Sequence, residues 1–134
     1  MADTSLPVIK AVIAALKASP ALSGLVEARV FSDVPQGAAF PYCVVSCSST
    51  PFAGQDFSGQ THNVRVQSFS RRPSAQECLA AQGAVFAALD RKEQSLTLDS
   101  GQPVYCHFLM SDRPFQEDDG KTWQSVIEFD LTIV

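Results

Sequence analysis

The sequence contains none of the short signatures that mark common enzyme and nucleotide-binding sites. It has no G-x-S-x-G nucleophile elbow, no G-x-x-x-x-G-K phosphate loop, no G-x-G-x-x-G turn and no H-E-x-x-H pair. Its two histidines, His62 and His107, fall in predicted strands with no acidic residue beside them in the sequence. We expect structural roles for both, at the surface or across strands, and we find no candidate catalytic residue, cofactor site or metal site.

Charged side chains are scarce, at 18% of the residues, whereas hydrophobic residues make up 46%. The formal net charge is -4, and no block of lysines and arginines gathers along one element. This balance disfavours a protein that grips nucleic acid through its phosphates. A folded chain with so few charges often covers part of its surface in an assembly.

Long hydrophobic runs are absent as well, because none approaches the roughly 20 residues that a membrane-spanning helix requires. The first residues, Met1-Ala2-Asp3-Thr4, lack the basic start of a secretion signal. We therefore expect a protein that is synthesised in the cytoplasm and does not enter a membrane.

The cysteines form no C-x-x-C pair and show no short zinc-ligand spacing with either histidine. We expect reduced thiols that act as small buried hydrophobes. They are Cys43, Cys47, Cys78 and Cys106.

Apolar residues at helical spacing predict two main helices. The first covers residues 6–18 with Ser5 as its cap, and Ser19-Pro20 starts a further short turn of helix. The second covers residues 75–89 and opens with a capping box, in which Ser74 accepts from the N–H of Glu77 and the Glu77 carboxylate reaches back. The stripes expected to pack on a sheet are Ile9, Val12, Ile13 and Leu16 in the first helix, and Cys78, Leu79, Gln82, Val85, Phe86 and Leu89 in the second.

Alternation of apolar and polar residues predicts the strands of one sheet. The run over residues 42–48 is nearly continuous in apolar residues, which predicts a strand buried on both faces, and residues 51–60 are expected to form a mobile loop. Residues 96–98 and 104–110 are expected to form a hairpin, and Asp119-Gly120 is the turn that pairs the last strand with the one before it. The predicted strands cover residues 26–34, 42–48, 61–71, 96–98, 104–110 and 123–133.

A chain of 134 residues can bury roughly two-thirds of its unfolded surface in one hydrophobic core. The order helix, strands, helix, strands favours an α+β fold. We expect a single domain over residues 1–134, with a mainly antiparallel twisted sheet and two main helices packed on one face.

Several stretches along the chain carry a family resemblance. They are the opening helix at residues 9–16, Leu22-Ser23-Gly24-Leu25-Val26 before Arg29-Val30-Phe31, Phe40-Pro41-Tyr42-Cys43-Val44-Val45, the strand over residues 64–71 that feeds an alanine-rich helix, and Gly120-Lys121-Thr122-Trp123 before the last strand. In this order the chain resembles the tail-completion proteins of long-tailed phages and related gene-transfer particles, which are also called tail terminators or tail-to-head joining proteins. The resemblance covers almost the whole chain.

The resemblance implies a structural protein without enzymatic activity, in a ring of six identical subunits at the head-proximal end of the tail tube. Such a ring stops tube polymerisation, contacts the tail tube protein and a head-tail connector or neck protein, and lets DNA pass through a channel without specific binding. The protein would be located in the virion, at the junction of tail and head. Net acidity suits a conduit, because an acidic channel repels phosphates.

Cyclic assembly requires one patch to meet a different patch on the neighbouring subunit. The sheet edges and the regions 51–60 and 112–121 are the expected sites of this contact. Candidate interface residues are Phe52, Phe57, Arg71, Arg72, Arg113, Phe115 and Trp123, and candidate residues of the channel lumen are Asp56, Glu117, Asp118 and Asp119.

Two other interpretations remain open from the sequence. A head-completion or stopper protein shares the small size and the ring assembly, but it would bind portal-side protein rather than the tail tube. A cytosolic small-ligand-binding or enzyme domain would be a stable monomer with a polar pocket that holds perturbed groups.

Overall fold

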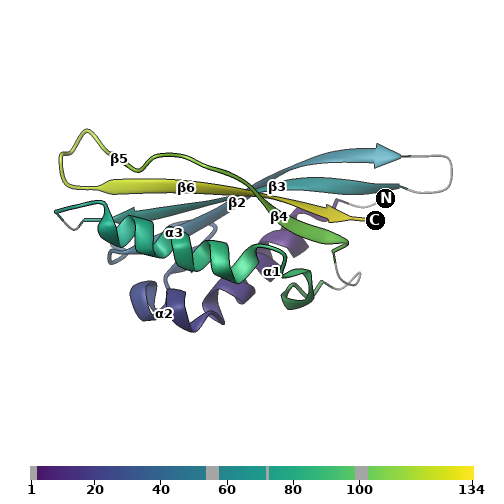
Figure 1. Cartoon of the computed structure of the whole chain (residues 1–134), viewed down its shortest axis with the longest axis horizontal. Helices are drawn as coiled ribbons and strands as arrows, with labels where there is room; N and C mark the ends of the chain where they lie inside the picture. The colour runs from purple at the N-terminus through teal and green to yellow at the C-terminus, as the bar shows by residue number, and fades with distance from the viewer. Residues whose placement is uncertain (1–2, 54–57, 72, 99–102) are drawn as a thin grey trace.

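Helices cover one face of a six-stranded sheet and leave the opposite face bare (Figure 1). The structure is a computed structural model that describes residues 3–53, 58–71, 73–98 and 103–134. Its mainly antiparallel sheet with a layer of helices is the α+β fold expected from the sequence. The elements are α1 (Ser5–Lys17), α2 (Pro20–Val26), β1 (Val30–Phe31), β2 (Tyr42–Ala53), β3 (Ser58–Ser70), α3 (Gln76–Leu89), the short 3-10 helix η1 (Glu93–Ser95), β4 (Tyr105–Ser111), β5 (Phe115–Gln116) and β6 (Trp123–Ile133).

The strands follow the order β1-β2-β3-β6-β4, and β5 pairs with β6 beside β4. β1 runs parallel to β2, whereas the other pairs are antiparallel. The hairpin of β2 and β3 projects at one end of the sheet, and the turn between β5 and β6 projects at the other end (Figure 1). The sheet therefore has two different edges and two different ends.

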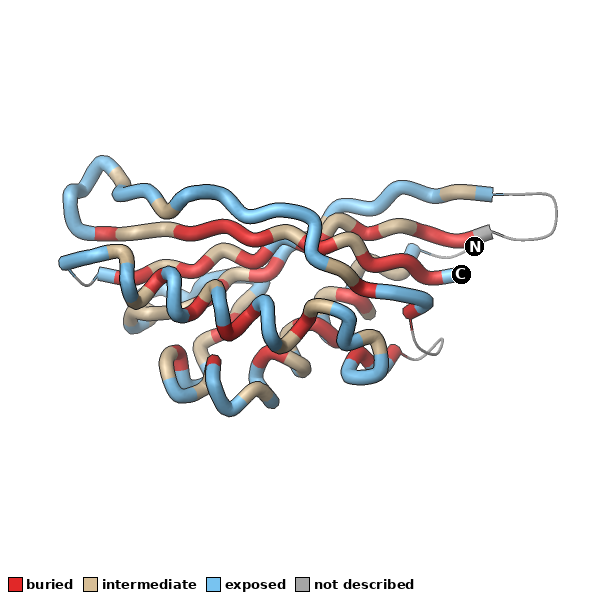
Figure 2. Tube along the Cα trace, viewed as in Figure 1, coloured by how far each residue is buried: buried red, intermediate tan, exposed pale blue. Residues whose placement is uncertain are grey.

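The hydrophobic core lies between the sheet and the helical layer, where buried positions face one another (Figure 2). Phe129 of β6 is its largest fully buried side chain, and Leu16 of α1 and Leu89 of α3 are also inaccessible to solvent. Full burial of such side chains stabilises the fold by roughly 1.5–3 kcal/mol each. On β6 the alternation expected from the sequence is present, because Ile127, Phe129 and Leu131 are all buried.

The helices α1 and α2 lie where the sequence predicts them, but the N-cap of α1 differs from the prediction. Ser5 is the first helical residue of α1, and Thr4 occupies the N-cap, so the prediction that Ser5 caps this helix is wrong. Ser19 caps α2, and its hydroxyl accepts from the N–H of Leu22 at 3.3 Å. Within the described residues no single helix has the length and hydropathy needed to cross a membrane; α1 and α2 together, bent by 86°, meet that test as a pair.

The start of α3 corrects the predicted capping box. The helix begins at Gln76, and its N-cap position makes no side-chain hydrogen bond, so Ser74 and Glu77 do not cap it reciprocally. The Glu77 carboxylate instead accepts from the hydroxyl of Ser70 at 2.7 Å. The Ser74 hydroxyl accepts from the N–H of Gln76 at 3.4 Å, while the contact of Glu77 fixes the helix to the end of β3.

The outward face of α3 also differs from the expected stripe. Leu79 and Phe86, which were expected to pack, are 46% and 40% exposed. The other apolar members of that stripe, Cys78, Val85 and Leu89, are buried as expected, and Ala81 and Ala84 are buried beside them. Phe86 still makes a contact at the edge of the sheet, because its ring lies 5.2 Å from that of Phe108 of β4.

β2 is longer and less buried than the sequence suggests. Its burial alternates, with Cys43 and Val45 buried and Ser46 exposed, so the prediction of a strand buried on both faces is wrong. The physical reason is the bare face of the sheet, which no helix covers. Most of the predicted loop over residues 51–60 is also strand, because β2 continues to Ala53 and β3 begins at Ser58.

The predicted strand over residues 96–98 is not a full strand. Leu96 and Leu98 are buried in the core, but only Leu98 forms an isolated bridge. β4 pairs with β6, at the edge of the sheet, rather than with this segment as a hairpin. The predicted turn at Asp119-Gly120 is confirmed, since β5 and β6 pair on either side of it.

Candidate functional site

The described side chains do not gather into a cluster suited to metal chemistry. Over residues 3–53, 58–71, 73–98 and 103–134, no group of three or more His, Cys, Asp or Glu residues could hold a metal ion. Burial raises the pKa of Cys43 to about 11 and that of Cys106 to about 12, so these thiols stay protonated at neutral pH. A hollow of about 340 Å³ beside α1 and α3 is lined largely by small residues, namely Ala15, Ala18, Ser19, Pro20, Ala87, Ala88, Lys92 and Ser95. The candidate sites are therefore surfaces.

The edge strand β4 is closed to further strand pairing over its first half. The backbone N–H of Cys106 donates to Glu93 Oε1 at 3.2 Å, and that of Phe108 donates to Asp90 Oδ1 at 2.9 Å. The Cys106 carbonyl accepts from the N–H of Arg91 at 2.8 Å. Hydrogen bonds from the backbone N–H groups of Glu93 and Cys106 lower the pKa of the Glu93 carboxyl. The segment after α3 thus occupies the groups that an added strand would use.

The opposite edge is open along the outer half of β2. In the described part of the chain, β1 pairs only with Cys43 and Val44, so the rest of β2 has no strand on that side. Edge strands are commonly protected by charged side chains, yet β2 contains no charged residue. Figure 2 shows exposed positions along this part of β2. One edge of the sheet is therefore capped and the other is available.

An aromatic cluster covers the end of the bare face beside β1. The ring centroid of Tyr42 lies 5.1 Å from that of Phe69, 5.0 Å from Phe40 and 6.1 Å from Phe31. The guanidinium of Arg71 lies over the Phe40 ring, 4.3 Å from its centroid. Arg71 was selected from the sequence, but these four rings were not. Phe40 and Tyr42 are neighbours along the chain, whereas Phe31 and Phe69 join them only when β1, β2 and β3 pair.

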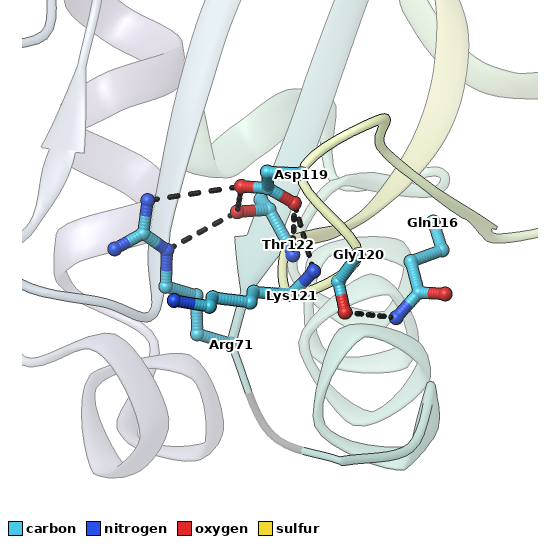
Figure 3. Close-up of polar contacts among 6 residues, drawn as sticks. All are labelled: Arg71, Gln116, Asp119, Gly120, Lys121 and Thr122. Carbon is cyan, nitrogen blue, oxygen red and sulfur yellow. Dashed lines mark hydrogen bonds and ion pairs between the residues drawn. The ribbon is translucent and has the colours of Figure 1, made fainter.

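The turn between β5 and β6 is held by one carboxylate (Figure 3). Asp119 Oδ1 accepts from the backbone N–H groups of Lys121 and Thr122, both at 2.8 Å, and Oδ2 accepts from the Thr122 hydroxyl at 2.7 Å. Arg71 donates from Nε to the same hydroxyl at 3.1 Å, and one of its terminal nitrogens lies 3.9 Å from Asp119. Gly120 has a φ of 68°, which favours glycine. These hydrogen bonds, that of the Thr122 hydroxyl first, lower the pKa of Asp119 to about 2.

The predicted lumen residues differ in their surroundings. Asp119 is engaged inside the turn, Glu117 is half-buried and Asp118 is exposed. Asp56 lies outside the described residues. The regions 51–60 and 112–121, which contain these candidates, lie at opposite ends of β6. Gln60 pairs with Ile133 at one end of this strand, and Gln116 pairs with Trp123 at the other.

The predicted interface residues also fall at separate places. Phe52 lies opposite Gly59 in the β2–β3 hairpin, whereas Arg113 and Phe115 are exposed at the β5 edge. Trp123 is half-buried at the start of β6, and its Nε1 has no hydrogen-bond partner among the described residues. Arg71 takes part in the contacts above, and Phe57 and Arg72 lie outside the described residues.

A buried histidine connects the start of α1 to β3. His62 Nε2 lies 2.7 Å from the hydroxyl oxygen of Thr4, and that hydroxyl donates to Gln60 Oε1 at 2.7 Å. Because the single hydroxyl proton is used on Gln60, Nε2 is the ring nitrogen that carries hydrogen. Burial lowers the pKa of His62, and the Asp3 carboxylate opposes that shift. This structural role agrees with the expectation from the sequence, which gave no sign that Thr4 is the partner.

Comparison with known proteins identifies the family. Residues 10–133 match the family described as Tail completion protein gp17. No curated protein matches the chain. A chain in the solved structure described as "Virion of native gene transfer agent (GTA) particle" shares the fold, with a TM-score of 0.84 and 21% sequence identity over 94% of this chain and 93% of that chain. The chain therefore belongs to the Tail completion protein gp17 family, and it is a structural protein of phage-type tails.

Proposed function

We propose that the protein closes into a ring of six identical subunits that caps the head-proximal end of a phage-type tail tube. Family membership over residues 10–133 carries this proposal. The fold supports it, because a head-to-tail ring joins two unlike patches. The sheet offers two unlike edges, one capped by Asp90 and Glu93 and the other open along β2.

The work of this ring is mechanical. By covering the growing end of the tube, it stops further addition of tail tube protein. Its other side presents a surface to a head-tail connector or neck protein and so joins the tail to the head. No bond is made or broken in this role, and the protein is not an enzyme.

DNA passes through the centre of the ring without specific binding. The formal charge of -4 on each subunit supports this, because an acidic channel repels the phosphate backbone. Of the candidate lumen residues, Asp118 is exposed, while Asp119 is engaged in its turn. Asp118 and Glu117 are therefore the first choices for the channel wall, together with Asp56.

The full 134 residues act as one such unit. It is synthesised in the bacterial cytoplasm and incorporated into the virion at the junction of tail and head.

The decisive experiment removes the gene from the particle-producing strain and examines the products by negative-stain microscopy. We expect tails of irregular length and heads without tails. Tails of normal length attached to heads would overturn the proposal, and so would purified particles without this chain at the head-proximal end of the tail. Light scattering of the purified protein across a concentration series, with images of the same samples, then tests for rings. Binding to portal-side protein but not to tail tube would identify a head-completion or stopper protein instead.

A further inference from the structure

One row of side chains crosses the bare face of the sheet from edge to edge. Phe115 of β5 pairs with Gln124 of β6, Gln124 pairs with Phe69 of β3, and Phe69 pairs with Tyr42 of β2. The Phe31 ring at the β1 edge contacts Tyr42. Directly paired residues point to the same face of a sheet. Phe115 and Tyr42 therefore lie at the same height on the same face. Phe31, which pairs with Val44, lies two residues further along at the β1 edge and contacts the Tyr42 ring from there.

At each edge of the sheet the row ends in an aromatic ring that is not fully covered. Phe115 is 48% exposed and makes no ring contact with another aromatic residue in the described part of the chain. At the other edge, Phe31 is only half-buried although it belongs to the aromatic cluster. An exposed ring at one edge and a partly covered aromatic cluster at the other are complementary apolar surfaces.

The strand directions allow these edges to meet in identical copies. β1 is parallel to β2, and three antiparallel pairings follow from β2 through β3 and β6 to β5, so β1 and β5 run in opposite directions. Two copies placed side by side in the same orientation then bring β5 of one antiparallel to β1 of the next. This arrangement joins two different edges, as a ring requires.

Charges beside the row are complementary in the same arrangement. Asp33 follows Phe31 by two residues, and Arg113 precedes Phe115 by two residues. Both charged residues are exposed. Because β1 and β5 run in opposite directions, Asp33 and Arg113 leave the row on the same side. Side-by-side copies thus bring an acidic residue toward a basic one.

We propose that Phe115 of one copy packs against Phe31 and Tyr42 of the next copy, with Arg113 beside the neighbour's Asp33. The inference rests on the proposed ring and specifies its subunit contact. The inference is also compatible with the capping of β4 by Asp90 and Glu93. The contact between copies lies at β5, so the first half of β4 does not have to pair with another strand.

Paired cysteines test the contact directly. A variant with Phe31→Cys and Phe115→Cys is expressed in the particle-producing strain, and its tails are mildly oxidised and separated without reductant. The head-to-tail contact predicts a ladder of covalent multimers beyond the dimer, while each single variant stays monomeric because its partner position holds phenylalanine. Dimers from Phe115→Cys alone would overturn the inference, because they require a symmetric contact. Intact rings without any ladder would also overturn it and leave the proposed function standing, whereas absence of rings in every preparation would contradict the function itself.

A charge exchange provides the second test. Arg113→Glu is expected to reduce the fraction of assembled rings at least several-fold, and adding Asp33→Arg to it should restore assembly. Lys10→Glu, an equal change on α1, is the matched control and should assemble normally. Circular dichroism confirms that each variant is folded. Folded Arg113→Glu protein that assembles as well as the control, or a double variant without recovery, would contradict the contact.

Discussion

Arg71 donates from Nε to the hydroxyl of Thr122 at 3.1 Å, and this contact joins the end of β3 to the start of β6. The same hydroxyl donates to Asp119 at 2.7 Å. The turn between β5 and β6 is therefore fixed to the sheet by side chains from both sides, and it presents its acidic residues in a defined position.

Removing the Asp119 carboxylate should loosen this turn. Its pKa is lowered from 3.8 to about 2, so the contribution of the charged form is complete above 3.8 and is lost as the pH falls toward 2. We expect Asp119→Ala to destabilise the protein at neutral pH, and Asp119→Asn, which keeps an acceptor for two N–H groups, to do so less. Urea unfolding at about pH 7 and at about pH 3 checks this. The differences from wild type should shrink at the lower pH, and equal differences at both would contradict the assignment.

Two glycines should respond in opposite ways to the same substitution. A Cβ on Gly59 would meet the carbonyl oxygen of Ile133 and the ring of Phe52, whereas one on Gly83 in α3 would meet nothing. Gly59→Ala is expected to cost about 1–3 kcal/mol through overpacking. Gly83→Ala should stabilise by about 0.5–1 kcal/mol, because alanine restricts the unfolded helix segment. Denaturant midpoints measure both, and a neutral Gly59→Ala would show that the β2–β3 hairpin has room for a Cβ at this position.

Acidification should weaken the attachment of α1 to β3. Burial lowers the pKa of His62 below its ordinary value of 6.5, so the neutral ring stabilises the fold fully above that value, and the stability falls as the pH drops below it. We expect wild-type protein to lose stability between about pH 7 and pH 5. His62→Gln, which keeps a donor for Thr4, should lose less over this interval. An identical pH profile for the two proteins would exclude His62 as the responsible group.

The capped edge of β4 can be opened by mutation. Asp90→Ala and Glu93→Ala each remove an acceptor from a backbone N–H, at a cost of about 1 kcal/mol per hydrogen bond. The double variant should also self-associate, because exposed strand edges pair with one another. Light scattering at matched concentrations measures this association. Glu93→Gln retains an acceptor oxygen and serves as the control; association of that variant to the same extent would point to lost charge rather than an opened edge.

Charge reversal at the acidic turn tests the channel. Glu117→Lys combined with Asp118→Lys should slow DNA ejection from assembled particles, because basic side chains in the lumen hold phosphates. Tail length and head attachment should remain normal. Dye-release kinetics follow ejection, and Asp118→Asn should give a smaller delay. Unchanged ejection from intact particles would remove these residues from the channel wall.

Local patterns along the chain predicted most of the fold. The alternation at Ile127, Phe129 and Leu131 located β6, and Asp119-Gly120 located its turn. Failures came where a tertiary contact replaced a local one, as when Glu77 accepted from Ser70 rather than capping α3. The sequence also could not show that one face of β2 would remain bare.

The proposed contact surface between copies was harder to predict, because its residues come together only when the strands pair in the observed register. Arg113 and Phe115 were selected from the sequence, but Phe31 and Tyr42 were not. The relation between Phe115 and Phe31 depends on consecutive pairings across the sheet. The spacing of these residues along the chain gives no indication that they lie at facing edges of the sheet.

The two projecting ends of the sheet are chemically unlike. Serine and threonine hydroxyls without any charge line the outer part of β2, whereas carboxylates crowd the turn at Glu117, Asp118 and Asp119. A collar whose strands run along its axis would carry the hydroxyl groups at one mouth of its channel and the acidic turns at the other. Such a collar has a built-in polarity, so it can be fitted between two different partners in one direction only.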